Sequence, residues 1–137
     1  ERRRGRVTVL TPHEGEFLRV GGDLSQGRTA AAEDFARRSG AVVVLKGPGT
    51  VVAGPDGRCR VNTTGNCGMA KGGSGDVLSG VVLALLGLGM DAFDACCCAV
   101  WLHGRAGDLA AQEKGQWGMT PTDLLERLPQ ALREVTE

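Results

Sequence analysis

Short apolar runs alternate with one amphipathic segment in the first part of the chain. Residues 7–10 predict a short buried strand, and the continuous apolar run at 41–45 is typical of a strand covered on both faces. Residues 29–39 carry four apolar side chains on one side of a helix, namely Ala31, Ala32, Phe35 and Ala36. Gly40 then supplies a helix stop. This order predicts one β-α-β unit, with a short helix over residues 13–20 after the first strand.

A hairpin and a series of helices are expected beyond this unit. Residues 51–53 and 59–62 flank the turn sequence GPDG at residues 54–57, which predicts two antiparallel strands. The segment 76–86 is apolar almost all round, so a buried helix is expected there, ended by Gly87 and Gly89.

Two more helical segments follow. Residues 92–111 predict a long helix, and Thr120 with Pro121 marks the start of another. Pro129 is expected to break that last helix before a short terminal one. One β-α-β unit with an added hairpin predicts an α/β protein whose sheet is smaller than a complete doubly wound sheet.

Composition and charge exclude some classes of function. The 137 residues fit one domain, and 16 basic and 16 acidic side chains cancel. This balance argues against a nucleic-acid partner and against a polybasic membrane anchor, so the basic cluster at residues 2–6 is interpreted as a solvated lead-in to a strand.

The distribution of apolar residues and cysteines indicates the cellular compartment of the protein. No apolar stretch reaches membrane-spanning length, and the first residues have no signal-peptide core. The five cysteines, three of them contiguous at 96–98, have no metal-type spacing and predict reduced thiols that serve as small core residues. A cytoplasmic protein is therefore expected.

The most informative segment is the run NTTGNCGMAKGGSGDVLSG at residues 62–80. Five glycines between Gly65 and Gly75 lead into an apolar helix, and glycine lets main-chain N–H groups approach a ligand closely. The start of a helix adds unpaired donors and a positive dipole end, so the junction predicts an anion site. Asp76 at this junction is expected to act as a general base on a hydroxyl beside the anion. The alternative is that Ser74 or Asp76 only caps the helix.

Four patterns in a fixed order resemble a known family. They are TPHEGE at 11–16, LKGPGT at 45–50, the glycine run at 62–80 and HGRAGD at 103–108. Together they resemble the ribokinase-like superfamily and, more closely, the ADP- or ATP-dependent NAD(P)H-hydrate dehydratases. The resemblance implies a three-layer α/β sandwich, with residues 1–137 as the C-terminal portion of the domain and of its sheet.

The resemblance also implies a reaction and its participants. Hydrated NADH or NADPH would lose water at the expense of ADP or ATP, with Mg²⁺ as cofactor. Asp76 would be the base and a contact to the hydrated nicotinamide. The nucleotide would be bound by two sets of residues: Gly72, Gly73 and Gly75 in the glycine run, and Lys46, Gly47, Pro48, Gly49 and Thr50 after the second strand.

Roles are implied for further polar residues. His13 matches a substrate-binding position, and Glu16 matches an acid that acts near Mg²⁺ through water; the alternative for the pair is helix capping. Lys71, often threonine in relatives, is a cation that could favour nucleotide phosphate. His103 and Asp108 are interpreted as structural, and Gly104 and Gly107 as sites of close packing against main chain.

Two alternatives stay open at this point. One is a kinase of a small alcohol, sugar or vitamin precursor from the same superfamily, which His13 and the HGRAGD segment disfavour. The other is a non-catalytic nucleotide-binding or oligomerisation module. The resemblance further implies a homo-oligomer, and an epimerase that is either fused to the dehydratase or separate from it.

Overall fold

The computed structural model describes residues 5–137, so most of the expected basic lead-in, residues 2–4, lies outside the described part. The chain divides into two compact units. Unit 1 comprises Glu1–Asn62 and Met90–Cys97, and unit 2 comprises Thr63–Gly89 and Cys98–Glu137. The helix α4 (Ala92–Gly118) begins in unit 1 and continues in unit 2.

Unit 1 holds a four-stranded sheet in the order β1-β2-β3-β4. Its strands are β1 (Val9–Leu10), β2 (Val42–Leu45), β3 (Val51–Ala53) and β4 (Cys59–Val61). β1 pairs parallel to β2, with Val9 opposite Val42, and the other pairings are antiparallel. The predicted β-α-β unit with a hairpin is therefore confirmed. The first strand is shorter than the run at 7–10 and is only half-buried, so the prediction of a buried strand there is wrong.

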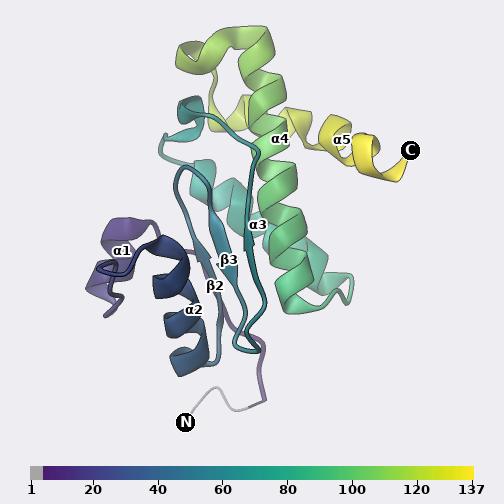
Figure 1. The fold of residues 1–137 in the computed structure, drawn as a ribbon. Coiled ribbons are helices and arrows are strands. Elements are labelled where there is room, and N and C mark those ends of the chain that lie inside the picture. Colours follow the sequence, from purple (N-terminus) through teal and green to yellow (C-terminus); the bar gives the residue numbers. More distant parts are fainter. Residues whose placement is uncertain (1–4) are drawn as a thin grey trace. The chain divides into compact units, whose positions relative to one another are not determined.

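Helix α2 (Arg28–Ser39) covers one face of this sheet (Figure 1). Its buried alanines pack with the side chains of alternate strand positions, in a core made of Phe17, Ala31, Ala32, Ala36, Val43, Leu45, Val51 and Ala53. Gly40 ends the helix in the left-handed conformation with φ 70°, as its sequence position predicts. The short helix α1 (Glu14–Arg19) contributes Phe17 to this core.

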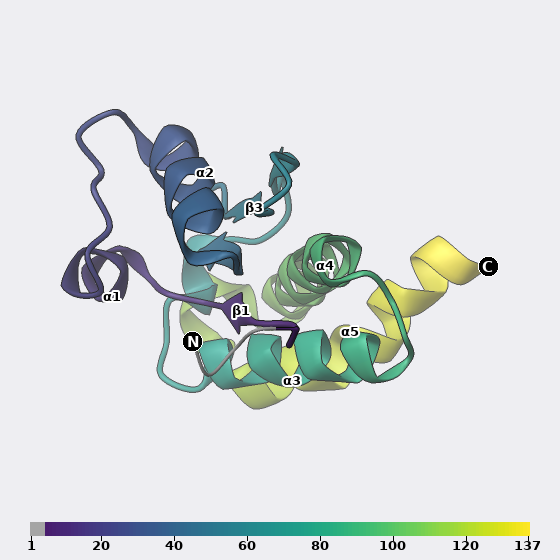
Figure 2. The same ribbon diagram turned by 90° about the horizontal axis from the view of Figure 1, so that it is seen from below.

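Unit 2 is helical. It contains the 3₁₀ turn η1 (Cys67–Met69), α3 (Ser74–Gly87), the main part of α4, and α5 (Pro121–Thr136). Helices α3 and α5 contact one another, and Figure 2 shows them side by side. Their apolar stripes meet α4 in a core built around Leu102, Ala106, Leu109, Leu124 and Ala131.

Two helix predictions are wrong. Pro129 lies inside α5 and does not break it. Pro129 and Leu125 are exposed, so the Leu125 carbonyl that loses its helical donor is accessible to water, while buried Leu124 and Ala131 hold the helix on both sides. Helix α3 is also not buried all round, because Leu83 is 70% exposed. The sequence shows which sides of a helix are apolar and could be buried, but the elements that pack against the helix decide which of those sides are buried.

None of the helices in the described part of the chain combines the length and hydropathy that crossing a bilayer requires. All five cysteines are free thiols, but the prediction that they serve as small core residues is wrong for Cys67 and Cys98, which are exposed, and only Cys96 is buried. Cys96 is a fully buried core residue, and burial raises the pKa of its thiol to about 12, so it stays protonated.

Candidate functional site

The carboxyl ends of the two parallel strands bring the first predicted site residues together in unit 1. His13 follows β1, Lys46 follows β2, and the two residues form an isolated parallel bridge. The Lys46 N–H donates to the Pro12 carbonyl at 2.8 Å. The strand-end position predicted for both residues is therefore confirmed. Ligands of open α/β sheets bind beyond this edge of the sheet.

His13 and Glu16 form a capping box at the start of α1. The Glu16 N–H donates to His13 Nδ1 at 3.1 Å, and the His13 N–H donates to Glu16 Oε2 at 2.8 Å. The capping interpretation of the pair is thus confirmed. The hydrogen bond from the His13 main chain, followed by the charges of His13 and Lys46, lowers the pKa of Glu16, so this carboxylate is ionised at neutral pH. Lys46 Nζ lies 3.9 Å from Glu16 Oε2.

The turn after β2 exposes main-chain N–H groups. Gly47 and Gly49 have positive φ values of 151° and 66°, where a side chain would be strained. The Thr50 hydroxyl donates to the Gly47 carbonyl at 3.1 Å. Within residues 5–137 no acceptor takes the N–H groups of Gly47 or Gly49. The turn can therefore offer two free donors to an anion.

Arg28 braces this turn, and the sequence interpretation missed it. Its guanidinium donates to the Pro48 carbonyl at 2.7 Å and to the Leu45 carbonyl at 2.9 Å. A Cβ at Gly47 would lie 2.8 Å from this guanidinium, so a side chain there would displace it. One signal was available: Arg28 is the first residue of α2, where the positive helix end disfavours a cation.

In unit 2 the glycine run ends at the start of α3. Gly73 is the N-cap residue with φ 97°, a left-handed conformation suited to glycine. Among the described residues, no acceptor takes the N–H groups of Gly72, Gly73 or Gly75. Gly72 and Gly73 are also exposed. This end of the helix therefore presents free donors and the positive end of the dipole, as an anion site requires.

Asp76 lies in the first turn of α3 and is exposed. The N-cap residue is Gly73, and among the described residues neither the Ser74 nor the Asp76 side chain accepts a hydrogen bond from the N–H groups of the first turn, so neither caps the helix. In the part of the chain that the structure describes, no ion pair or hydrogen bond engages the Asp76 carboxylate. An acid without a structural partner beside free N–H donors can accept a proton from a bound hydroxyl.

Helix α4 holds the glycine run in place. Asp108 accepts hydrogen bonds from the Gly65 N–H at 3.0 Å and from the Asn66 side chain at 2.9 Å. His103 Nε2 donates to the Ser74 carbonyl at 2.9 Å, at the start of α3. The structural roles expected for both residues are confirmed.

The two glycines of the same helix face allow a close approach. A Cβ at Gly104 would lie 2.7 Å from the carbonyl carbon of Thr64, and a Cβ at Gly107 would lie 2.8 Å from Met69 Cγ. Both distances are shorter than real Cβ contacts, so α4 packs closely on the glycine run at both positions. The predicted approach to main chain is confirmed for Gly104, whereas Gly107 packs against the Met69 side chain.

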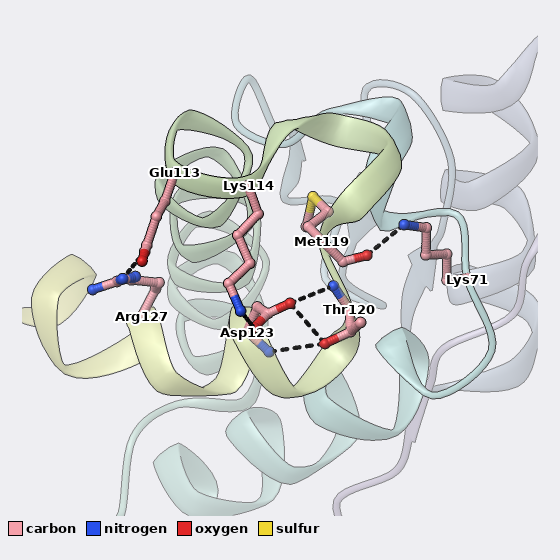
Figure 3. A network of polar contacts seen from close by, with 7 residues as sticks. All are labelled: Lys71, Glu113, Lys114, Met119, Thr120, Asp123 and Arg127. Atoms are coloured by element: carbon pink, nitrogen blue, oxygen red, sulfur yellow. Dashed lines mark hydrogen bonds and ion pairs between the residues drawn. The ribbon is translucent and has the colours of Figure 1, made fainter.

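Lys71 corrects one expectation. The resemblance predicts that its ammonium favours nucleotide phosphate, but in the structure it donates to the main-chain carbonyls of Gln116 and Trp117. It also donates to the Met119 carbonyl (Figure 3). The positive charge thus lies at the negative end of α4. Sequence could not reveal these partners, because they are main-chain carbonyls more than 40 positions away and every residue carries such a group.

The donor set for a magnesium ion is small. No group of three or more His, Cys, Asp or Glu side chains among residues 5–137 could hold a metal ion. Magnesium ordinarily keeps several waters and binds through nucleotide phosphates with one or two carboxylates. The ionised Glu16, whose side chain is 46% exposed, fits a contact through water.

Comparison with known proteins places these features in a family. The NAD(P)H-hydrate dehydratase family model matches residues 1–130. A bifunctional NAD(P)H-hydrate repair enzyme of Thermofilum pendens is 49% identical over 95% of this chain and 26% of its own length.

Solved structures of similar proteins have the same fold as this chain. The ADP/ATP-dependent NAD(P)H-hydrate dehydratase of Bacillus subtilis, co-crystallised with ATP/Mg²⁺, is 38% identical with a TM-score of 0.89, covering 94% of this chain and 48% of that one. A ribokinase-like superfamily protein of Enterococcus faecalis is 30% identical with a TM-score of 0.76, covering 92% and 44%. The chain thus spans about a quarter of the bifunctional relative and about half of the solved chains, and its α/β fold is ribokinase-like. The chain belongs to the NAD(P)H-hydrate dehydratase family.

Proposed function

We propose that the chain takes part in the nucleotide-dependent dehydration of hydrated NADH or NADPH, as the C-terminal portion of the dehydratase domain. The observation that carries this proposal is the exposed, unpartnered Asp76 carboxylate beside the free N–H groups of Gly72, Gly73 and Gly75. The ATP and Mg²⁺ used with the similar Bacillus subtilis enzyme support the choice of co-substrate and metal.

The proposed reaction assigns one task to each group. Asp76 contacts the hydrated nicotinamide and removes the proton of its ring hydroxyl, whose oxygen then attacks the terminal phosphoryl group of ADP or ATP. The nucleotide leaves shortened by one phosphate. Inorganic phosphate then departs from the ring with its bonding electrons, and a neighbouring ring proton is lost as the double bond forms. Water is thereby removed at the expense of one phosphoanhydride bond.

The main-chain donors stabilise the charge that moves in this reaction. Free N–H groups at Gly72, Gly73 and Gly75 bind phosphoryl oxygens at the positive end of α3. In unit 1, Lys46, Gly47, Pro48, Gly49 and Thr50 form the other proposed nucleotide-binding segment, and His13 contacts the substrate. Mg²⁺ would neutralise phosphate charge when bound, with Glu16 holding one of its waters.

Partners and compartment complete the proposal. The name of the bifunctional relative supports a second repair activity, which we assign to a fused or separate epimerase. The chain is proposed to form a homo-oligomer. Its five free thiols support a reducing compartment such as the cytoplasm.

The test is phosphate release from ADP and from ATP, with and without hydrated NADH, alongside the recovery of NADH absorbance. Asp76→Asn is expected to lower turnover by about 10²- to 10⁴-fold, the range for loss of a general base, while nucleotide still binds. Asp94→Asn is the matched control, because Asp94 is an exposed acid in the first turn of α4.

Two results would contradict the dehydratase. Transfer of phosphate to a stable alcohol without recovery of NADH would indicate a kinase. Nucleotide binding without any turnover would indicate a non-catalytic module.

A further inference from the structure

The Lys71 ammonium has all of its donors occupied. Its Nζ lies 3.3 Å from the Gln116 carbonyl oxygen and 3.0 Å from that of Trp117. It also donates to the Met119 carbonyl (Figure 3). An ammonium group has three N–H donors, so none is left for a phosphate oxygen in this arrangement. Its contribution must therefore come through the main chain that it holds.

The three carbonyls belong to the α4–α5 junction, which we define as residues 115–121. Gly115 leaves the helical conformation with φ 72° and ψ 158°, so the carbonyls beyond it do not continue the ladder of α4. The junction ends at Pro121, which has no N–H to donate. A lysine cation is suited to such a place, because helix carbonyl ends carry partial negative charge.

The glycine run touches the same junction on both sides of Lys71. A Cβ at Gly68 would lie 2.8 Å from Gln116 Cα and 2.8 Å from Met119 Sδ. A Cβ at Gly73 would lie 3.3 Å from Pro121 Cγ. Gly68 is buried, so this contact excludes solvent. The segment 68–73 thus rests on the α4–α5 junction, and Lys71 is its polar attachment.

We propose that Lys71 is a positioning residue, which fixes segment 68–73 on the α4–α5 junction and so holds the N–H groups of Gly72, Gly73 and Gly75 in place for the nucleotide phosphates. This inference rests on the proposed function for its consequence in nucleotide binding. Its structural part, the attachment of the segment, can be tested without a nucleotide.

The experiment compares the parent chain with Lys71→Met, Lys71→Arg and Lys114→Met. Methionine keeps the apolar stem of Lys71 without the charge, and arginine keeps the charge with a different donor geometry. Lys114→Met is the matched control: it removes a lysine whose ammonium binds Asp123 at 2.6 Å, beside the same junction. Amide hydrogen exchange over residues 68–75 and 115–121 is measured first, followed by calorimetric titration with ADP.

Lys71→Met is expected to speed exchange in both segments and to weaken ADP binding by about tenfold, as loss of a charge-assisted hydrogen bond implies. Lys71→Arg is expected to recover most of both losses. Lys114→Met is expected to leave the exchange of residues 68–75 and the ADP affinity unchanged. Thermal melting of each variant shows whether it is folded at the temperature of the measurement.

Three results would overturn the inference. The first is weaker ADP binding in Lys71→Met with unchanged exchange, which would mean that Lys71 contacts phosphate directly. The second is faster exchange with unchanged ADP affinity. The third is an equal effect of Lys114→Met, which would mean that any loss of stability at the junction suffices. A parent chain without affinity for ADP or ATP would count against the proposed function, while the exchange data would still decide whether Lys71 fixes the segment.

Discussion

At the scale of single residues, two glycines in helices of unit 2 should respond to alanine in opposite directions. Gly104→Ala places a Cβ 2.7 Å from the Thr64 main chain, so it should lower the free energy of unfolding by about 1–3 kcal/mol. Gly80→Ala in α3 meets nothing within 4 Å and should raise it by about 0.5–1 kcal/mol, because alanine favours the helix. Urea denaturation of both variants measures the difference, and equal effects would contradict the close packing of α4 on the glycine run.

The acid at the start of α5 gives a pH dependence with a definite sign. Lys114, and then Thr120, hydrogen-bond to Asp123 and lower the pKa of its carboxyl from 3.8 to about 2. A lowered folded-state pKa contributes stability that is complete above the unfolded pKa and is lost as pH falls toward the folded one. Asp123→Asn should therefore flatten the fall in stability between about pH 4 and about pH 2.

Urea unfolding across this pH range makes the comparison. Glu126→Gln, which changes an exposed acid on the same helix, serves as the control and should keep the slope of the parent. The same slope in Asp123→Asn and in the parent would show that this ion pair does not contribute.

Sequence could predict residue roles where the signal is local. The capping box joins His13 and Glu16, which are three positions apart, and the glycines of the run mark where main chain must approach closely. Arg28 and Lys71 were missed or misassigned because both bind main-chain carbonyls far along the chain. Such acceptors are present at every residue and leave no mark on side-chain identity.

At the scale of elements, Pro129 is the clearest departure from the predicted pattern. It interrupts the hydrogen bonding of α5 while the helix continues through it. Pro129→Ala supplies the missing N–H to the Leu125 carbonyl and should stabilise the chain by about 1 kcal/mol or more. Thermal unfolding measures the gain in stability. The control Gln130→Ala adds no hydrogen bond and should change the melting temperature little. A lower melting temperature for Pro129→Ala would show that the proline is suited to the backbone conformation there.

Most elements follow from apolar periodicity and from turn residues. The strand runs, the GPDG hairpin and the helix stop at Gly40 are local signals, and the structure has all three. The errors concern context. Periodicity cannot decide whether burial of Leu124 and Ala131 outweighs one lost hydrogen bond, nor which side of the apolar helix α3 is covered.

At the scale of the whole molecule, zero net charge coincides with exposed apolar side chains. The 16 acidic and 16 basic groups cancel at pH 7, and Leu83 and Leu88 are 70% and 80% exposed. Little charge repulsion then opposes association through apolar surface, which fits the proposed homo-oligomer. Near neutral pH, sedimentation should show an average mass that rises with protein concentration. At a fixed concentration, that mass should be lower at pH values far from neutral, where the chain carries a net charge.

Two variants separate the contribution of charge from that of apolar surface. Leu83→Glu adds one negative charge and removes exposed apolar area, while Gln112→Glu adds the same charge at an exposed position of α4 and removes no leucine. If the exposed side of α3 carries the association, Leu83→Glu should weaken it strongly and Gln112→Glu only slightly. If both substitutions weaken association equally, net charge alone controls the association, because the two substitutions change the charge equally. A parent mass that does not depend on concentration and equals that of one chain would contradict the homo-oligomer itself.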